Sequence, residues 1–450
     1  MLLFAIVVSA GFLAPPPESA PADSSGSRVV DAFVDRLPFP PELAPAVSFW
    51  KNVFGFWEDD QVVFFDARHL EKIYEIRRLP ALDGGRASER RREKLRDAWK
   101  EGILRDLEAL TAPGVDYDRL QGRRDRLFRI WDESRDPQVY RDAAEQLRTQ
   151  RGTRGNFRQG VARSARYVES FRAIFHEEGV PEDLVFLPHV ESSYRWDARS
   201  SVGALGMWQF MPGTARRYMV VDQAVDERLD PHTAARSAAR FLKECYGELE
   251  AWPLAVTAYN HGLDGMKNAV RETGSRDIAT IIDRYRGPLF GFAGRNFYPE
   301  LLAAATVAES LLAHPGDLAL AAPEDLMTFE LPAFAKLGTV TKAFGLTSRE
   351  ILTLNPAIRH PAKDGDLYLT RGFQLKLPPR DGFEPAQAFA AIPAAERPLE
   401  RPVLTYRVRP GDSLSTIAAR NKTTVRALQR LNDIRNPHHV RAGTVLRLPH

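Results

Sequence analysis

A glutamate that follows an apolar stretch is the first candidate for chemistry in this 450-residue sequence. Glu191 comes after a predicted helix start at Pro181 and an apolar run that includes Val185 and Phe186. Burial disfavours the charged form of a carboxyl group, so we expect a raised pKa and a proton held near neutral pH. Such a group can act as a general acid. Taken alone, a glutamate at a helix end is more simply explained as a solvated side chain.

The loop after this glutamate contains residues that suit contact with a polysaccharide. Residues 200–215 combine a glycine-rich turn with an amide, Gln209, and a thioether, Met211. Because Gly203 and Gly206 have no side chains, a glycan strand could lie close to the backbone there. Turn chemistry and packing explain the same residues without any ligand, so the segment does not indicate a function by itself.

A third segment, residues 258–262, places a polar aromatic residue and an amide, Tyr259 and Asn260, at another predicted helix end. Packing again explains it when it is considered alone. The three segments together, in this order and at this spacing, form a specific pattern. Glu191 is the one carboxylate inside the pattern, whereas ordinary glycosidases use two.

The pattern resembles the motifs of lytic transglycosylases with the soluble-lytic-transglycosylase (SLT) catalytic domain, over about residues 156–315. The order of segments is similar to that of the membrane-bound murein transglycosylase D group. The resemblance implies a lysozyme-like α+β domain that acts on peptidoglycan glycan strands without a metal or cofactor. It implies that Glu191 is the single acid/base. It also implies substrate contacts for Ser200, Gln209, Met211, Tyr259, Asn260 and Tyr298.

Tyr298 enters this set because the last motif departs from the family pattern. Many relatives carry Glu-Thr shortly before a Tyr-Val pair, whereas residues 293–298 here read AGRNFY. If Phe297 aligns with the tyrosine of the relatives, a hydroxyl group is lost at that position. Tyr298 could then supply the hydroxyl instead.

The resemblance also implies a mechanism. Glu191 would protonate the oxygen between N-acetylmuramic acid and N-acetylglucosamine, and would then take the proton of the C6 hydroxyl as a 1,6-anhydro ring forms. Two alternatives stay open. A goose-type lysozyme-like hydrolase would need a second carboxylate, for which Asp197 and Asp230 are candidates. A non-catalytic peptidoglycan-binding protein would keep the fold without the activity.

Two C-terminal segments resemble each other, which indicates duplicated modules. Residues 331–378 and 404–449 each read as a strand, two short helices, an asparagine-containing turn and a strand. The second resembles the lysin motif (LysM), a βααβ module that binds N-acetylglucosamine-containing glycans, and the first resembles a degenerate copy without the Gly-Asp turn. The resemblance implies glycan contacts for Gly411, Asp412, Ser413, Leu414, Asn432 and Ile434. Helix capping explains the same residues equally well.

The rest of the chain completes a mainly α protein with small β modules. The aromatic-rich residues 49–65 are expected to be core, and segments such as residues 70–79 and 119–148 read as helices. The expected organisation is a signal-like segment at 1–27, a helical region at 28–155, the SLT domain at 156–320, the degenerate LysM-like module at 328–379, a Pro- and Ala-rich linker at 380–402 and the LysM domain at 403–450.

Composition and the N-terminal segment limit where the protein can act and what it can bind. The apolar residues 1–13 suit a signal peptide better than a membrane span, so we expect export to the periplasm or cell envelope. The single cysteine, Cys245, reads as a buried helix residue, which excludes an internal disulfide, a cysteine metal cluster and a cysteine-linked lipid anchor. A formal net charge of +3, with acids and bases intermixed, gives no indication of nucleic acid binding.

Overall fold

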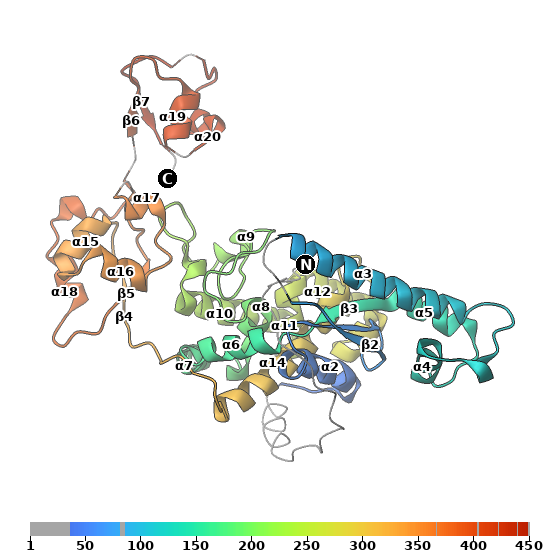
Figure 1. Cartoon of the computed structure of the whole chain (residues 1–450). Helices are drawn as coiled ribbons and strands as arrows, with labels where there is room; N and C mark the ends of the chain where they lie inside the picture. Colours follow the sequence, from blue (N-terminus) through green and yellow to red (C-terminus); the bar gives the residue numbers. More distant parts are fainter. Residues whose placement is uncertain are drawn as a thin grey trace. The chain divides into compact units, whose positions relative to one another are not determined.

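The computed structural model describes residues 37–81, 86–365, 367–402, 405–421, 423–438 and 440–448 (Figure 1). The signal-like segment at 1–27 lies outside the described residues. The described part of the chain is mainly helical with three small antiparallel sheets, which confirms the predicted fold class. None of the described helices has the length and apolar character that a membrane span requires. The chain divides into two compact units, and residues 210–234 and 325–450 make up the second.

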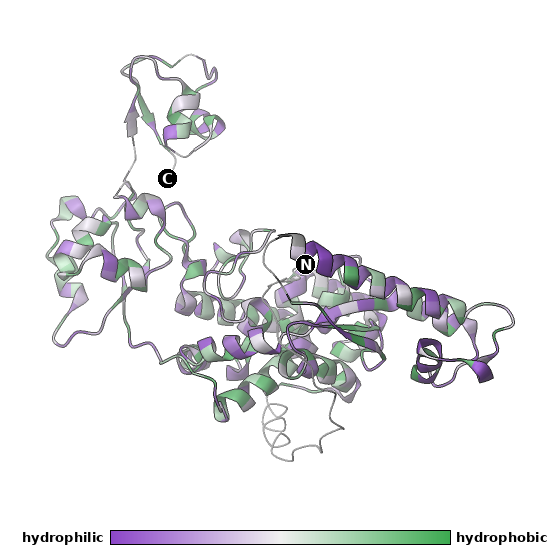
Figure 2. Ribbon diagram, in the orientation of Figure 1, coloured by the Kyte–Doolittle hydropathy of each residue, from purple (hydrophilic) through white to green (hydrophobic). Residues whose placement is uncertain are grey.

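The first unit begins with a three-stranded sheet in the order β2-β1-β3. Its strands are β1 (Gln61–Asp66), β2 (Ile73–Arg78) and β3 (Leu147–Arg151). The helices between the second and third strands are α3 (Arg86–Ala109), η2 (Tyr117–Arg119), α4 (Arg123–Ile130) and α5 (Pro137–Gln146). Val62 and Phe64 share a core with residues of α3, α4 and α5, and Figure 2 shows the long α3 as largely hydrophilic. The helical prediction for residues 28–155 is wrong where the three strands lie, including β2 within residues 70–79, because the spacing of a few apolar side chains fits both a strand and a helix there.

The aromatic-rich residues 49–65 form part of the core, as predicted. They run from α2 (Ala44–Gly55), which follows η1 (Pro41–Leu43), into β1, and Phe56 is the exposed exception at 69%. The indole nitrogen of Trp50 donates to Oδ1 of Asn296 at 2.9 Å, on α14 (Phe292–Ala313). The rings of Phe54 and Phe157 stack with centroids 4.8 Å apart. The N-terminal region is thus packed into the first unit through these contacts.

The helices around the candidate site also belong to the first unit. They are α6 (Arg154–Ser164), α7 (Val168–Glu178), η3 (Glu182–Phe186), α8 (Leu187–Ser192), α10 (Pro231–Leu249), α11 (Trp252–His261), α12 (Leu263–Thr273), α13 (Ile278–Arg284) and α14, with the start of α10 lying in the second unit. Helix α14 packs against α2, α8 and α11, and its buried alanines permit the close approach of these neighbours. Cys245 is buried in α10, as predicted.

The second unit contains both C-terminal modules. Residues 210–234 hold α9 (Pro212–Ala215) and η4 (Glu227–Leu229). The first module consists of β4 (Met327–Glu330), α15 (Leu337–Phe344), α16 (Ser348–Leu354), α17 (His360–Lys363), β5 (Gln374–Leu377), α18 (Pro385–Ala390) and η5 (Ala394–Glu396). The second consists of β6 (Thr405–Arg407), α19 (Leu414–Arg420), α20 (Val425–Leu431) and β7 (Val445–Arg447). The predicted βααβ order is confirmed in the second module. The first module differs, because its first strand β4 precedes residue 331 and a third short helix, α17, lies between α16 and β5.

Residues 380–402 are folded, whereas the sequence predicted a linker there. They form α18 and η5, and Phe389 and Ile392 are buried in the core of the first module. Proline is compatible with the first turn of a helix, where Pro385 stands, so a composition rich in Pro and Ala does not separate a linker from a short helix.

Candidate active site

Glu191 lies near the end of α8, on the short helix that the sequence predicts after Pro181. Its side chain is half-buried. Burial raises the pKa of the Glu191 carboxyl from 4.5 to about 8, because the apolar surroundings disfavour the charged form. The carboxyl group can therefore carry a proton at neutral pH, as a general acid must.

The turn after α8 holds Glu191 in place. Ser193 and Tyr194 both adopt left-handed conformations, with φ of 52° and 59°, which non-glycine residues keep only where their surroundings impose them. The Ser192 hydroxyl donates to the carbonyl of Met207 at 2.7 Å. The Tyr194 hydroxyl donates to the carbonyl of Val185 at 2.5 Å. These bonds fix both sides of the turn, and with it the backbone of the glutamate.

Tyr259 is a predicted site residue whose pKa is affected by the charge of Glu191. Its hydroxyl, on α11, donates to the carbonyl of Trp208 at 2.8 Å. Burial and then the charge of Glu191 raise the pKa of Tyr259 well above 10, so the phenol stays neutral at working pH. Asn260 follows on the same helix and is exposed. The motif of residues 258–262 therefore brings a neutral hydroxyl close to the candidate acid.

The glycine-rich loop is closed by two of the predicted site residues. The Ser200 hydroxyl accepts from the backbone nitrogen of Ala204 at 2.8 Å. The side-chain nitrogen of Gln209 donates to the carbonyl of Gly206 at 2.7 Å. Oε1 of Gln209 is buried without a hydrogen-bond partner among the described residues. Gly203 and Gly206 have φ of 95° and 84°, which explains why glycine stands at both positions.

Two other predicted contacts lie elsewhere. Tyr298 is fully buried, and its hydroxyl donates to the carbonyl of Pro38 at 2.6 Å. The expectation that it supplies a hydroxyl to the cleft is therefore not supported, because its one donor is already committed inside the first unit. Met211 belongs to the second unit, where its side chain is 44% exposed.

A second carboxyl group, which the sequence reasoning missed, interacts with Glu191. Glu300 lies on α14, which packs against α8, and its side chain is half-buried. Burial, and then the charge of Glu191, raise the pKa of Glu300 to about 8. Glu300 has the same sequence feature as Glu191, because it is a single acidic residue within an apolar run. The sequence of a helix does not show which of its faces lies against the site, so this feature alone did not identify Glu300.

The two aspartates proposed as a second carboxylate are engaged elsewhere. Asp197 is exposed and lies 3.5 Å from Nε of Arg195. Asp230 is buried in the second unit, where it accepts from the backbone nitrogen of Thr233 and pairs with Lys376 at 3.8 Å. Among the described residues, no group of three or more His, Cys, Asp or Glu side chains could hold a metal ion.

The predicted glycan contacts of the C-terminal module have internal roles. Asp412 accepts from the Tyr406 hydroxyl at 2.7 Å and from the backbone nitrogen of Arg409 at 2.8 Å. Ser413 caps α19, and Gly411 has a φ of 86°. Asn432 binds backbone groups of the same module. Leu414 and Ile434 pack in its core. Capping and packing therefore explain these six residues, and their contact with glycan stays a prediction.

Comparison with protein families identifies two domains. The Transglycosylase SLT domain matches residues 170–282, and the LysM domain matches residues 406–449. The match confirms the resemblance stated from the motifs. It includes Glu191, the glycine-rich loop and Tyr259.

Comparison with individual proteins gives relatives of the same kind. Membrane-bound lytic murein transglycosylase D of Escherichia coli strain K12 is 26% identical over 268 residues, which cover 58% of this chain and 58% of that protein. Peptidoglycan transglycosylase gp16 of Escherichia phage T7 is 33% identical over 140 residues, 30% of this chain and 10% of that protein. The solved structure of an inactive mutant of the lytic transglycosylase Slt from Pseudomonas aeruginosa aligns over 34% of this chain and 25% of that chain, at 21% identity and a TM-score of 0.28. The chain is thus homologous to the transglycosylase of E. coli and spans a little over half of its length.

Proposed function

From an SLT transglycosylase domain and a C-terminal LysM domain, we propose that this chain is a lytic transglycosylase that cuts the glycan strands of bacterial peptidoglycan. The observation that carries the proposal is Glu191, a half-buried carboxyl group with a pKa of about 8, beside the neutral hydroxyl of Tyr259. A group that is mostly protonated at neutral pH can donate to the oxygen of a leaving sugar.

The proposed reaction uses one carboxyl group twice. In the first step Glu191 gives its proton to the oxygen that joins C1 of N-acetylmuramic acid to N-acetylglucosamine. The C1–O bond breaks, and the acetamido oxygen of the same muramic acid stabilises the electron-poor C1. In the second step the Glu191 carboxylate removes the proton of the C6 hydroxyl, whose oxygen bonds to C1. The product is a 1,6-anhydro end, no water is consumed, and Glu191 is protonated again.

The neighbours of Glu191 support these steps. A nucleophile within the same sugar needs no separate binding event, which favours ring closure over attack by water. The Gln209 side chain donates to the carbonyl of Gly206 and its Oε1 is buried, so Gln209 would support the glycine-rich loop from inside. We assign Ser200 to the shape of the loop, because its hydroxyl closes the turn.

The surrounding modules and the N-terminus suggest where the reaction takes place. We propose export to the periplasm or cell envelope, where peptidoglycan lies, directed by the signal-like residues 1–27. The LysM domain would hold the enzyme on its insoluble substrate, so that the catalytic domain meets nearby strands at a raised effective concentration.

Hydrolysis is a second candidate, because one observation favours it. Glu300 is a carboxyl group close enough to Glu191 for the charge of Glu191 to raise the pKa of Glu300. In its ionised form Glu300 could activate water, as the second carboxylate of an inverting glycosidase does, and its pKa of about 8 places that form at higher pH. Under this alternative the product would carry a reducing end.

Release of soluble glycan from purified peptidoglycan tests the assignment of Glu191. We expect Glu191→Gln to lower release by about a hundredfold or more, because the amide cannot donate the proton. The matched control is Asp197→Asn, since Asp197 is an exposed carboxyl group that pairs with Arg195. It should release glycan at close to the wild-type rate. Wild-type release by Glu191→Gln would show that the acid is another group.

A further inference from the structure

The two C-terminal modules share one internal hydrogen-bond pattern. In the second module the Asn432 side chain donates to the carbonyls of Leu428 and Arg447, and accepts from the backbone nitrogen of Arg447. In the first module the Asn355 side chain donates to the carbonyls of Ile351 and Lys376, and accepts from the nitrogen of Lys376. The asparagine at the end of the second helix thus ties down the last strand in both modules.

This pattern fixes which loops correspond. The loop between the first strand and first helix covers residues 408–413 in the second module and 331–336 in the first. The loop between the asparagine and the last strand covers residues 432–444 and 355–373. In the second module these two loops carry most of the residues expected to contact glycan. Residues 331–336 and 355–373 therefore form the corresponding face of the first module.

In the first module this face is covered by residues 222–226 of the same compact unit. The backbone nitrogen of Asp226 donates to the carbonyl of Ala357 at 2.8 Å, and that of Arg359 donates to the carbonyl of Ala224 at 2.8 Å. Val225 forms an antiparallel bridge with Ile358. Ala224 and Val225 are buried in the core that the module builds from its own residues, including Ala333 and Ala335 from the other loop.

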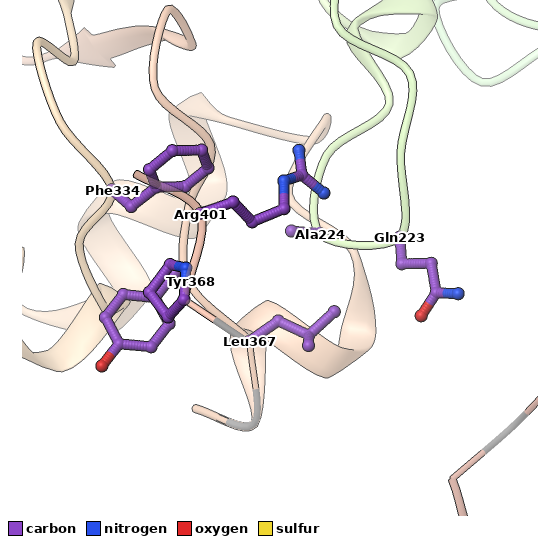
Figure 3. Close-up of a pocket in the computed structure, with 7 residues that line it drawn as sticks. Gln223, Ala224, Phe334, Leu367, Tyr368 and Arg401 are labelled. Atoms are coloured by element: carbon purple, nitrogen blue, oxygen red, sulfur yellow. The ribbon is translucent and has the colours of Figure 1, made fainter. Parts of the chain in front are cut away.

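Side chains reinforce this contact. Oδ2 of Asp222 accepts from the Thr370 hydroxyl at 2.7 Å and from Nη2 of Arg401 at 2.7 Å. The buried Glu227 accepts from the backbone nitrogen of Gln374 at 3.2 Å. What remains of the face is a narrow recess, where Phe334, Leu367, Tyr368 and Arg401 of the module surround Ala224 (Figure 3). The guanidinium group of Arg401 lies over the Phe334 ring at 5.4 Å and leaves little of that ring for a sugar.

We propose that the first module does not bind glycan and instead anchors residues 210–234, with residues 222–226 occupying the face that the second module offers to sugar. Under this proposal the module serves as a structural support for this segment, and Asp222, Thr370 and Arg401 hold the two together.

Hydrogen exchange of the full chain, with and without N-acetylglucosamine hexamer, tests the occupied face without using turnover. We expect the amides of Asp226 and Arg359 to be protected in the free chain, because both are bonded across the contact. The hexamer should leave residues 355–373 unchanged, whether or not residues 432–444 respond. Fast exchange of these amides in the free chain, or new protection of residues 355–373 by the hexamer, would overturn the proposal.

A pair of arginine variants tests the contact itself. Arg401→Met removes the ion pair to Asp222, whereas Arg371→Met alters an exposed arginine of the same module and is the matched control. Arg401→Met should speed exchange at the amide of Asp226, because the contact loses one of its supports. Arg371→Met should leave this exchange unchanged. Equal exchange in the two variants would contradict the role of Arg401 in the contact.

Discussion

Among single residues, two carboxyl groups with raised pKa values, Glu191 and Glu300, determine which reaction the site can perform. Glu191 was identified from sequence because its apolar run is local and can be read along the chain. Glu300 was missed because its relation to Glu191 arises from the packing of α14 on α8, which no local pattern contains. The bond of Tyr298 to Pro38 could not be predicted for a similar reason, since the two residues lie far apart in the sequence.

The pH dependence of kcat/KM should report the Glu191 proton. The acid form is needed for the first step, and the pKa of Glu191 is about 8, so activity should fall as pH rises through about 8. The charge of Glu191 raises the pKa of Glu300, and repulsion between two carboxylates acts on both, so Glu300→Gln should move the fall to lower pH. The exposed Glu272→Gln is the control and should leave the profile in place. An unchanged profile in Glu300→Gln would mean that the two groups are not coupled.

Folding stability should also depend on whether the Glu191 carboxyl is protonated. The folded pKa of Glu191 lies above that of the unfolded chain, so the unfolded state ionises first as pH rises, and folding stability is lost between about pH 4.5 and 8. Glu191→Gln removes this loss. Chemical denaturation should therefore find the variant more stable than wild type at pH 8, on the order of 1 kcal/mol or more, with a smaller difference at pH 5. Equal stability at both pH values would contradict a raised pKa.

At the scale of elements, the turn after α8 and the sheet show what sequence patterns can and cannot supply. The helices of the SLT domain and the βααβ order of the C-terminal module followed from periodicity and turn residues. The strands β1 and β2 did not, because six residues are too few for their spacing of apolar side chains to separate a strand from a helix. The left-handed pair Ser193 and Tyr194 was also invisible, since it is held by distant partners such as Arg163, which donates to the Ser193 carbonyl at 2.7 Å.

Tyr194→Phe tests whether that turn positions the glutamate. Loss of the hydroxyl leaves the buried carbonyl of Val185 without its donor, which should cost about 1–3 kcal/mol of folding stability. Displacement of Glu191 should lower kcat on the order of tenfold. Tyr246→Phe, at a residue that is 38% exposed, is the matched control for both measurements. A Tyr194→Phe enzyme with wild-type kcat would show that the turn does not position the acid.

In the whole molecule, segments that follow one another in the sequence do not all belong to the same compact unit. Residues 210–234 lie between parts of the first unit in the chain, yet they share a core with the module at residues 327–392. A contact of this kind joins segments far apart in the chain, such as Asp222 and Thr370 with a separation of 148 positions, so composition and periodicity could not reveal it. The C-terminal module, in contrast, has a core of its own residues, which a local sequence pattern can indicate.

Removal of the C-terminal module should separate binding from chemistry. A chain that ends at Pro402 keeps the other cores intact, because the core of residues 406–448 contains only residues of that module. We expect weaker retention on insoluble peptidoglycan, with little change of kcat on short soluble glycan strands. Cosedimentation and turnover of the two substrates measure these effects. Equal retention of the full and shortened chains would show that the module does not hold the enzyme on its substrate.

Mass spectrometry of the products released from purified peptidoglycan distinguishes ring closure by the C6 hydroxyl from hydrolysis. We expect muropeptides that end in 1,6-anhydro-N-acetylmuramic acid, one water lighter than hydrolysis products, from the wild type and none from Glu191→Gln. Reducing ends from the wild type would contradict the single-carboxylate mechanism and would point to Glu300 as the base that activates water.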